Sequence, residues 1–261
     1  MSDEIPSFQP VPDRPAKRSD GKHDGEPLIS VRNLHKSFGD KHVIRGINFD
    51  VWGGETVGII GPSGCGKSTI LKLLCGLLQP DSGEITLRSQ DVGLVFQGSA
   101  LLNSLTVGEN LALPLRMRDM KPAEKERTIQ EKLSLVGLGD YLDAYPTQLS
   151  GGQQKRTGFA RAIVNNPRII LYDEPTTGLD PVMSTIVEDY IIKLEEELRA
   201  ASIVVTHQYS TWTRTADRII MMFAGNIVWQ GDPNDAIGAD NAYMRQFVHA
   251  TRQGPMASGA V

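Results

Sequence analysis

The sequence predicts an α/β fold with a mostly parallel core sheet, an antiparallel β subdomain and an α-helical subdomain. Short apolar runs at 56–60, 169–172 and 202–206 have the length of buried strands. The first two are each followed by a stretch in which apolar residues recur at helical spacing. Alternating strands and helices favour parallel pairing, because each helix carries the chain back across the face of the sheet.

The other elements are expected from the same patterns. The strands expected in the antiparallel part are 28–31, 42–51 and 84–87, and a strand at 93–96 is expected in the core sheet. The expected helices are 68–74, 106–118, 122–136, 155–165 and 182–198. In the helix at 122–136, Ile129, Leu133 and Val136 share one face and charged residues occupy the other.

Length and composition divide the chain into three parts. At 261 residues, core volume does not limit folding. Residues 1–27 hold five prolines among charged residues, so we expect a disordered tail there. One domain is expected at 28–250, with its helical insert at about 98–165. Residues 251–261 are small and turn-prone, and are expected to form a flexible tail or a strap onto a neighbouring subunit.

Charge and cysteine content argue against two classes of function. A net charge of −4 without a basic stripe argues against a nucleic-acid-binding protein. The two cysteines, Cys65 and Cys75, have no histidine at metal-binding spacing, so reduced thiols are expected rather than a zinc site or a bridge. No apolar run approaches the roughly 20 residues that span a bilayer, so the chain is not expected to form a pore.

A glycine-rich segment lies between the strand at 56–60 and the helix at 68–74. Its residues are Gly61, Pro62, Ser63, Gly64, Cys65, Gly66, Lys67, Ser68 and Thr69. Glycines let backbone N–H groups turn towards a phosphate, and the helix N-terminus adds its positive dipole end. Lys67 is expected to reach the β and γ phosphates and Ser68 to ligate Mg²⁺. The alternative is a glycine-rich turn that fits the pattern by chance.

Two adjacent acids end the apolar run at 169–172. Asp173 is expected to hold Mg²⁺ through water, and Glu174 to polarise the attacking water as general base. Side chains alternate along a strand, so the two acids can take different roles. The alternative is a strand that ends in two solvated acids.

The segment Leu149-Ser150-Gly151-Gly152-Gln153, placed before a helix and about twenty residues before the acidic strand end, resembles the ATP-binding cassette (ABC) family. The resemblance implies a P-loop NTPase fold of the ABC nucleotide-binding type, with ATP and Mg²⁺ bound. It also implies a head-to-tail homodimer in which Ser150, Gly151, Gly152 and Gln153 cap the γ-phosphate held by the opposite copy. Ser150 is at the same time an ordinary helix N-cap residue.

The resemblance also implies roles for isolated residues. Phe38 stands where an aromatic ring stacks on adenine, although a lone phenylalanine is more often core. Gln97 stands where a glutamine contacts Mg²⁺ and water and reports to a membrane partner. His207 stands where a histidine reaches the γ-phosphate, although a lone histidine is usually structural. Asp180 belongs to a loop that contacts the other copy, and Pro181 is expected to open the next helix.

The helical insert carries the expectation about cargo. The Ala100-Leu101 pair, Asn110 with Pro114-Leu115-Arg116, and Met244-Arg245-Gln246-Phe247 resemble the bacterial branch that moves phospholipid between the inner and outer membranes. This resemblance implies an ATPase subunit on the cytoplasmic face of the inner membrane. Its partners would be an integral membrane permease and a lipid-binding periplasmic protein. The alternative is an ABC system for another cargo, such as amino acids or lipoproteins.

Further expectations concern partner contact and reactivity. Leu101, Leu102, Leu105 and Val107 are expected either to receive a short partner helix or to form the core of the insert. Cys65, near a helix N-terminus, is expected to have a lowered pKa and to react readily. Cassette proteins of chromosome maintenance or translation are disfavoured, because the gap between Gln97 and Leu149 leaves no room for a coiled coil and only one cassette is present.

Overall fold

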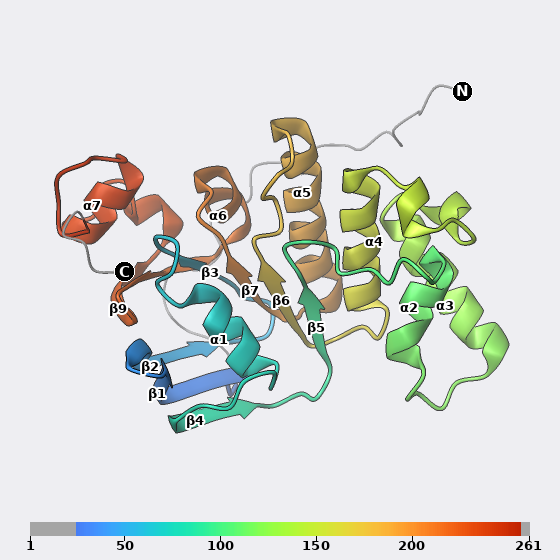
Figure 1. The fold of residues 1–261 in the computed structure, drawn as a ribbon, viewed down its shortest axis with the longest axis horizontal. Helices are drawn as coiled ribbons and strands as arrows, with labels where there is room; N and C mark the ends of the chain where they lie inside the picture. The colour runs from blue at the N-terminus through green and yellow to red at the C-terminus, as the bar shows by residue number, and fades with distance from the viewer. Residues whose placement is uncertain (1–24, 257–261) are drawn as a thin grey trace.

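The computed structural model describes residues 25–256. The expected N-terminal tail lies outside the described residues except for its last three positions, and residues 257–261 of the expected C-terminal tail also lie outside them. The two sheets occupy one end and the centre of the molecule, and a group of helices forms the other end (Figure 1).

The larger sheet has six strands in the order β5-β6-β7-β3-β8-β9. Neighbouring strands are parallel except for β8 and β9, which are antiparallel, so the predicted mostly parallel core is confirmed. The strands are β3 (Thr56–Ile60), β5 (Val92–Val95), β6 (Ile169–Asp173), β7 (Ala201–Val205), β8 (Arg218–Phe223) and β9 (Asn226–Gly231). The sequence patterns had not predicted β8 or β9.

The smaller sheet is antiparallel, as predicted, with the order β2-β1-β4. Its strands are β1 (Ile29–Phe38), β2 (Lys41–Val51) and β4 (Ser82–Leu87). The strand β1 extends well beyond the predicted 28–31, which places Phe38 at its end. Helix α1 (Lys67–Leu74) packs between the two sheets, where its leucines join one core cluster with residues of both (Figure 1).

Helices α5 (Pro181–Leu198) and α6 (Tyr209–Thr215) cover the opposite face of the larger sheet. The sequence of β6 is a continuous apolar run because both faces of the strand are buried. Ile169 and Leu171 pack on the α1 side, whereas Ile170 and Tyr172 pack on the α5 side. Trp212 of α6 is fully buried against β3 and β8. Both faces of the sheet are therefore covered.

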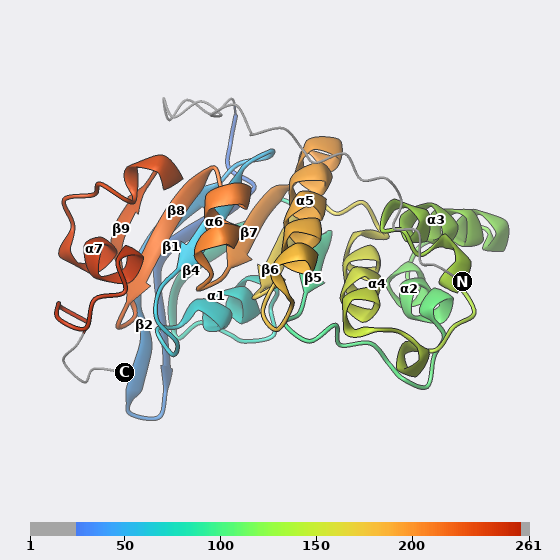
Figure 2. The same cartoon turned by 90° about the horizontal axis from the view of Figure 1, so that it is seen from above.

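The helical insert comprises α2 (Val107–Leu115), α3 (Pro122–Leu135), the short 3₁₀ turns η1 (Gly139–Tyr141) and η2 (Pro146–Gln148), and α4 (Gly151–Ile163). It has its own apolar core and lies beyond the edge strand β5 (Figure 2). Helix α4 starts at Gly151, four residues earlier than predicted, because Ser150 caps it.

The C-terminal region adds the 3₁₀ turn η3 (Pro233–Asp235) and α7 (Ala242–Val248). The Met244–Phe247 segment lies on α7, with Met244 fully buried. Residues 251–256 pack back on this helix: Gln246 Nε2 donates to the carbonyl of Thr251 at 3.2 Å, and its Oε1 accepts from the amide of Met256 at 2.7 Å. Among the helices of residues 25–256, none combines the length and the apolar character that crossing a bilayer requires.

A buried asparagine organises the loop between β5 and α2. Asn110 is fully buried on α2, and its Oδ1 accepts from the amide of Leu102 at 2.8 Å. Its Nδ2 donates to the carbonyls of Leu102, Leu105 and Thr106 at 2.9–3.2 Å. One side chain therefore satisfies four backbone groups of a loop that has no regular structure.

We expect Asn110→Asp to destabilise the fold by roughly 3–5 kcal/mol, because a carboxylate of the same shape faces three carbonyl oxygens without a donor. Chemical denaturation measures the loss. The matched control is Asn103→Asp in the same loop, whose exposed side chain should tolerate the charge. Equal stability of the two variants would contradict this role of Asn110.

Candidate nucleotide-binding and hydrolysis site

Glycines are required in the loop that joins β3 to α1. Gly61 and Gly66 have φ values of +145° and +108°, a region that other residues rarely adopt. A Cβ on Gly61 would lie 2.2 Å from the carbonyl oxygen of Met222, and one on Gly66 would lie 2.7 Å from Ile44 Cδ1. The loop therefore fits between β8 and β2 only with hydrogen at these positions.

Lys67 opens α1 and lies against the loop. Its Nζ donates to the carbonyl of Gly61 at 2.8 Å and to that of Pro62 at 3.1 Å, and the residue is only 7% exposed. Helix α1 has Gly66 at its N-cap position and no side-chain cap. Its first N–H groups and the lysine charge are thus directed at the same space, which is the arrangement that binds a phosphate.

Ser68 of α1 and Asp173 of β6 meet at the carboxyl ends of the parallel strands. The Ser68 hydroxyl donates to Asp173 Oδ1 at 2.9 Å. Burial raises the pKa of Asp173 and the charge of Glu174 adds to the rise, while the Ser68 hydrogen bond opposes it. Hydroxyl and carboxylate oxygens are ligands that Mg²⁺ prefers in phosphate sites, so this pair fits that ion.

Glu174 and His207 form a second pair at the same edge. His207 Nδ1 lies 2.8 Å from Glu174 Oε1, and Thr177 Oγ1 donates to Glu174 Oε2 at 3.1 Å. Because an ionised carboxylate only accepts, the shared proton belongs to Nδ1 of the imidazole. Glu174 has a φ of +47°, and its amide donates to the carbonyl of Val205 on β7.

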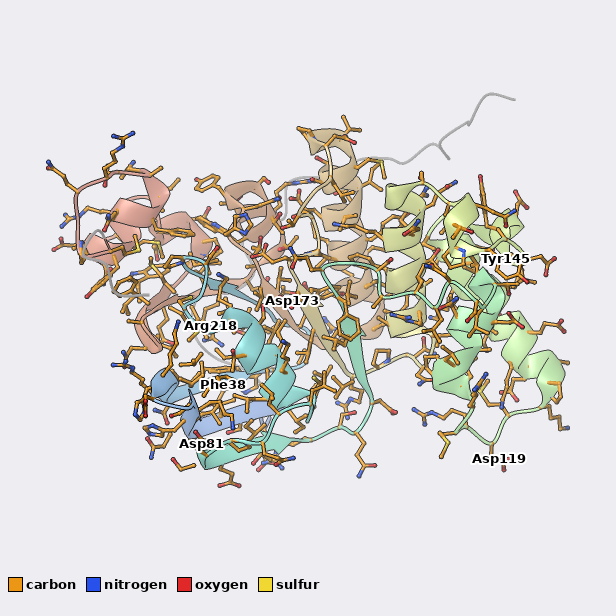
Figure 3. The ribbon with its side chains drawn as sticks, viewed as in Figure 1. Phe38, Asp81, Asp119, Tyr145, Asp173 and Arg218 are labelled. Carbon is orange, nitrogen blue, oxygen red and sulfur yellow. The ribbon has the colours of Figure 1, made fainter. Side chains whose placement is uncertain are left out.

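One open cleft of about 510 Å³ brings Lys67, Ser68, Glu174 and His207 together, whereas Asp173 lies behind Ser68 and is not among the lining residues. The lining residues are Phe38, Lys41, Val43, Ser63, Gly64, Gly66, Lys67, Ser68, Thr69, Gln97, Glu174 and His207. Phe38 is 48% exposed, with Lys36 Nζ 5.7 Å from its ring centroid, so it is not a core residue. Phe38 and Asp173 lie in the central part of the molecule, whereas Tyr145 lies at the helical end (Figure 3).

The Ser150–Gln153 segment does not line this cleft. Ser150 is exposed, its Oγ accepts from the amide of Gln153, and Gln153 Oε1 accepts from the amide of Ser150 in a capping box. The first intrahelical bond runs from the Gln154 amide to the Ser150 carbonyl, so the amides of Gly151 and Gly152 precede it. No atom lies within 4 Å of a Cβ built on Gly151.

Lys155 of α4 contacts the loop that follows Glu174, which sequence analysis had not anticipated. Its Nζ donates to the carbonyl of Thr177 at 2.5 Å and to that of Pro175 at 3.3 Å. Burial lowers the pKa of Lys155. A lysine within a helical pattern gives no sequence signal of such a contact, because its partners are backbone carbonyls 20 and 22 residues away.

The expectation that Cys65 is reactive is wrong. Its side chain is buried, with 4% of the residue exposed, and burial raises the pKa of the thiol despite the nearby charge of Lys67. Placement near a helix N-terminus lowers a thiol pKa only where the thiolate is also solvated. Here the sulfur belongs to the core between the two sheets.

A second hollow, of about 550 Å³, lies between β5 and the insert. Its apolar lining includes Phe96 and Leu102, which are 39% and 49% exposed. Arg161 on α4 supports one wall by donating to the carbonyls of Ser99 and Ala100. Of the two alternatives expected for Val107, partner surface or core of the insert, the structure shows the second, because the residue is fully buried in that core.

Comparison with known families gives one match that covers half of the chain. The family model described as ABC transporter matches residues 44–177, which include the glycine loop, the Ser150–Gln153 segment and both acids.

Similar curated proteins differ in what they are named for. The chain is 39% identical to Protein TRIGALACTOSYLDIACYLGLYCEROL 3, chloroplastic, of Arabidopsis thaliana, over 90% of this chain and 77% of that protein. It is 36% identical to a probable ribonucleotide transport ATP-binding protein, mkl, of Mycobacterium leprae, over 91% and 73%. It is 39% identical to the spermidine/putrescine import ATP-binding protein PotA of Pasteurella multocida over 85% of this chain, but spans only 63% of that protein.

Two solved structures share the fold. CbiO1 from Clostridium perfringens, described as part of the transporter complex cbiONQ, has a TM-score of 0.75 at 25% identity and covers 87% of this chain and 95% of that one. A dimeric ATP-binding cassette, MJ0796, in a post-hydrolysis state with ADP and Pi, has a TM-score of 0.71 at 32% identity, over 79% and 99%.

We expect Asp173→Asn to raise the melting temperature of the protein at neutral pH, measured with a chelator and without nucleotide. A carboxyl whose pKa is raised in the folded state destabilises that state once it ionises. The advantage of the variant should shrink as the pH falls through the raised pKa of Asp173 and vanish below the pKa of a free aspartate. A variant no more stable than the parent at pH 8 would contradict this.

Proposed function

The chain belongs to the ABC transporter family and is an ATP-binding ATPase, and from this premise we propose that it drives a membrane permease that moves phospholipid between the inner and outer membranes of a bacterium. The observation that carries the hydrolytic part is the Glu174–His207 pair, held at 2.8 Å in the cleft that also contains Lys67 and Ser68.

ATP binding is assigned to the loop and its helix. Backbone N–H groups between Gly61 and Gly66 and the Lys67 ammonium would hold the β and γ phosphates, and the exposed face of Phe38 would stack on the base. Ser68, Asp173 and Gln97 would hold Mg²⁺, which supplies charge compensation on the phosphates.

Hydrolysis is assigned to the carboxylate. A water attacks the γ phosphorus, the bond to the bridging oxygen of ADP breaks, and Glu174 accepts the proton that the water gives up. In the doubly protonated form, His207 would donate its Nδ1 proton to Glu174, which fixes the ring, and would donate its Nε2 proton to a phosphate oxygen. Thr177 holds the second carboxylate oxygen, so the acid keeps one orientation.

A second copy is proposed to complete each site. Ser150 and the amides of Gly151 and Gly152 offer donors to an anion, yet they do not line the cleft of their own chain. A head-to-tail homodimer would bring them to the γ-phosphate of the opposite copy. Loss of that phosphate removes the group that joins the two copies, so hydrolysis would open the dimer.

The hollow beside β5 is proposed as the docking site of the permease. Its apolar side chains suit the apolar face of a short helix, and Arg161 lies at its wall. Gln97 follows Phe96 directly, so a helix seated on Phe96 would act on a residue of the nucleotide cleft. This arrangement would place the chain on the cytoplasmic face of the inner membrane.

Phospholipid is the cargo that we favour. The relative from Arabidopsis thaliana, which is similar over 90% of this chain, is named for a galactolipid. A periplasmic lipid-binding protein would then be a further partner. Similarity to a polyamine import protein favours the second candidate, a cargo other than lipid, such as the amino acids or lipoproteins considered above.

The cargo is tested by purifying the native membrane complex without detergent and comparing its lipids with those of the surrounding membrane. Enrichment of one phospholipid class, together with a lipid-binding periplasmic protein, would support the proposal. A complex with bulk lipid composition and a periplasmic protein that binds a water-soluble cargo would overturn it.

We expect Glu174→Gln to lower the rate of ATP hydrolysis by roughly 10²–10³-fold while ATP binding persists, because the amide cannot accept the proton. The variant should accumulate as a dimer on a sizing column with ATP. Lys67→Ala should instead lose ATP binding and remain monomeric. Hydrolysis by Glu174→Gln at the parent rate would exclude Glu174 as the base.

We expect Leu102→Asp to weaken association with the membrane complex by roughly tenfold, because a charge in the hollow opposes burial of an apolar helix. Binding of ATP by the isolated chain should not change. Leu77→Asp is the control, since Leu77 is 61% exposed and does not line the hollow. Equal recovery of both variants with the complex would contradict docking at this site.

A further inference from the structure

The loops that follow β6 and β7 are joined at two places. Glu174 contacts His207 at 2.8 Å, and two residues further along, the Thr176 hydroxyl donates to Gln208 Oε1, also at 2.8 Å. Thr176 is fully buried, and Gln208 follows His207 directly. The second contact therefore holds together the same two backbone segments that present the hydrolytic pair.

This second contact continues into the core between α5 and α6. The Thr176 hydroxyl also lies 2.8 Å from the Thr211 hydroxyl, and Thr211 donates to Glu188 Oε1 at 2.9 Å. The single proton of Thr176 is therefore shared between Gln208 Oε1 and Thr211 Oγ1. Arg214 donates to Glu188 Oε2 at 2.8 Å and, with its other nitrogen, to Asp189 Oδ1 at 2.8 Å. Glu188 and Asp189 are 1% and 2% exposed.

The buried charges make Thr211 hard to displace. Glu188 Oε1 accepts from Thr211, and Oε2 accepts from Arg214. Removing either donor would leave a buried carboxylate oxygen without a partner, which is costly. Thr211 is itself fully buried on α6, and so is its neighbour in the chain, Trp212. Thr176 is therefore tied to a rigid part of the fold, not to another loop alone.

Glu174 needs such support because of its backbone. With a φ of +47° it has a left-handed conformation, which residues other than glycine keep only where the surroundings hold them. The segment from Glu174 to Thr177 has no regular structure of its own. Its side-chain anchors include Thr177 on Glu174 itself, Lys155 on the carbonyls of Pro175 and Thr177, and Thr176 on Gln208 and Thr211. Of these, only Thr176 joins the segment to the loop that carries His207.

We propose that Thr176, Gln208 and Thr211 form a positioning clamp that holds Glu174 against His207 in the geometry that hydrolysis requires. The clamp residues do not line the nucleotide cleft, so they act through the backbone of the two loops. The inference rests on the role proposed for Glu174 as general base. The competing interpretation is that the same hydrogen bonds only fasten α6 to α5, in which case they affect stability and nothing else.

Thr211→Val tests the clamp, because it keeps the shape of the side chain and removes its hydroxyl. Thr56→Val is the matched control: Thr56 is also fully buried, and its hydroxyl donates at 2.9 Å to Glu195, another buried glutamate of α5. Thr56 begins β3, at the opposite end of the strand from the glycine loop. Thr211→Ser restores the hydroxyl and serves as the rescue.

Steady-state hydrolysis is measured on the full chain, alone and within its membrane complex, with melting temperatures for all variants. We expect Thr211→Val to lower kcat about tenfold or more, with KM for ATP within about twofold, since the phosphate loop is untouched. Amide hydrogen exchange in residues 174–178 should rise. Thr56→Val should lose comparable stability with kcat and exchange in this segment unchanged, and Thr211→Ser should recover most of the lost kcat.

The clamp is overturned if Thr211→Val keeps the parent kcat, or if Thr56→Val loses as much kcat as Thr211→Val does. It is also overturned if exchange in residues 174–178 does not change. Failure of the proposed function has a different signature: Glu174→Gln would then hydrolyse ATP at the parent rate. In that event the exchange measurement alone decides whether Thr211 orders the loop.

Discussion

The site depends on parallel pairing of three neighbouring strands, β6, β7 and β3. Val205 at the end of β7 pairs with Asp173 on one side and with Ile59 on the other, so the three strands end together. The amide of Glu174 then bonds to the Val205 carbonyl, and the amide of Thr206 to that of Ile59. Because these carboxyl ends are aligned, the phosphate loop, both acids and His207 lie at one edge of the sheet.

Close packing around the loop follows from this alignment. The loop lies against β8 on one side and β2 on the other, so a Cβ on Gly61 would collide with β8 and one on Gly66 with β2. The same packing encloses Cys65 within the core between the sheets. The smaller sheet therefore has two roles, since it forms one wall of the loop and presents Phe38 at the edge of the cleft.

The acids at the sheet edge illustrate a balance between stability and function. Asp173 is partly buried beside a second carboxylate, and its pKa is raised, so the folded protein keeps a charge in an unfavourable place. Glu174 has an unusual backbone conformation next to it. Costs of this kind persist where the surrounding structure holds the groups in place, and they are commonly found at sites of chemistry. Lys155, Thr176 and Thr177 are the neighbours that hold this loop.

The sequence by itself determined the glycine loop between β3 and α1, the mostly parallel α/β core and the cap at Ser150, because these depend on local patterns: apolar period, glycine spacing and side chains that bond within three residues. Strands β8 and β9 were not predicted, because the place of β8 in the sheet depends on pairing with β3, which is distant in the chain. Only the tertiary structure decided that His207 meets Glu174, that Thr176 reaches Thr211, that Val107 is core and that burial raises the pKa of Cys65. Such properties arise from contacts between residues far apart in the chain and from burial, neither of which a local pattern contains.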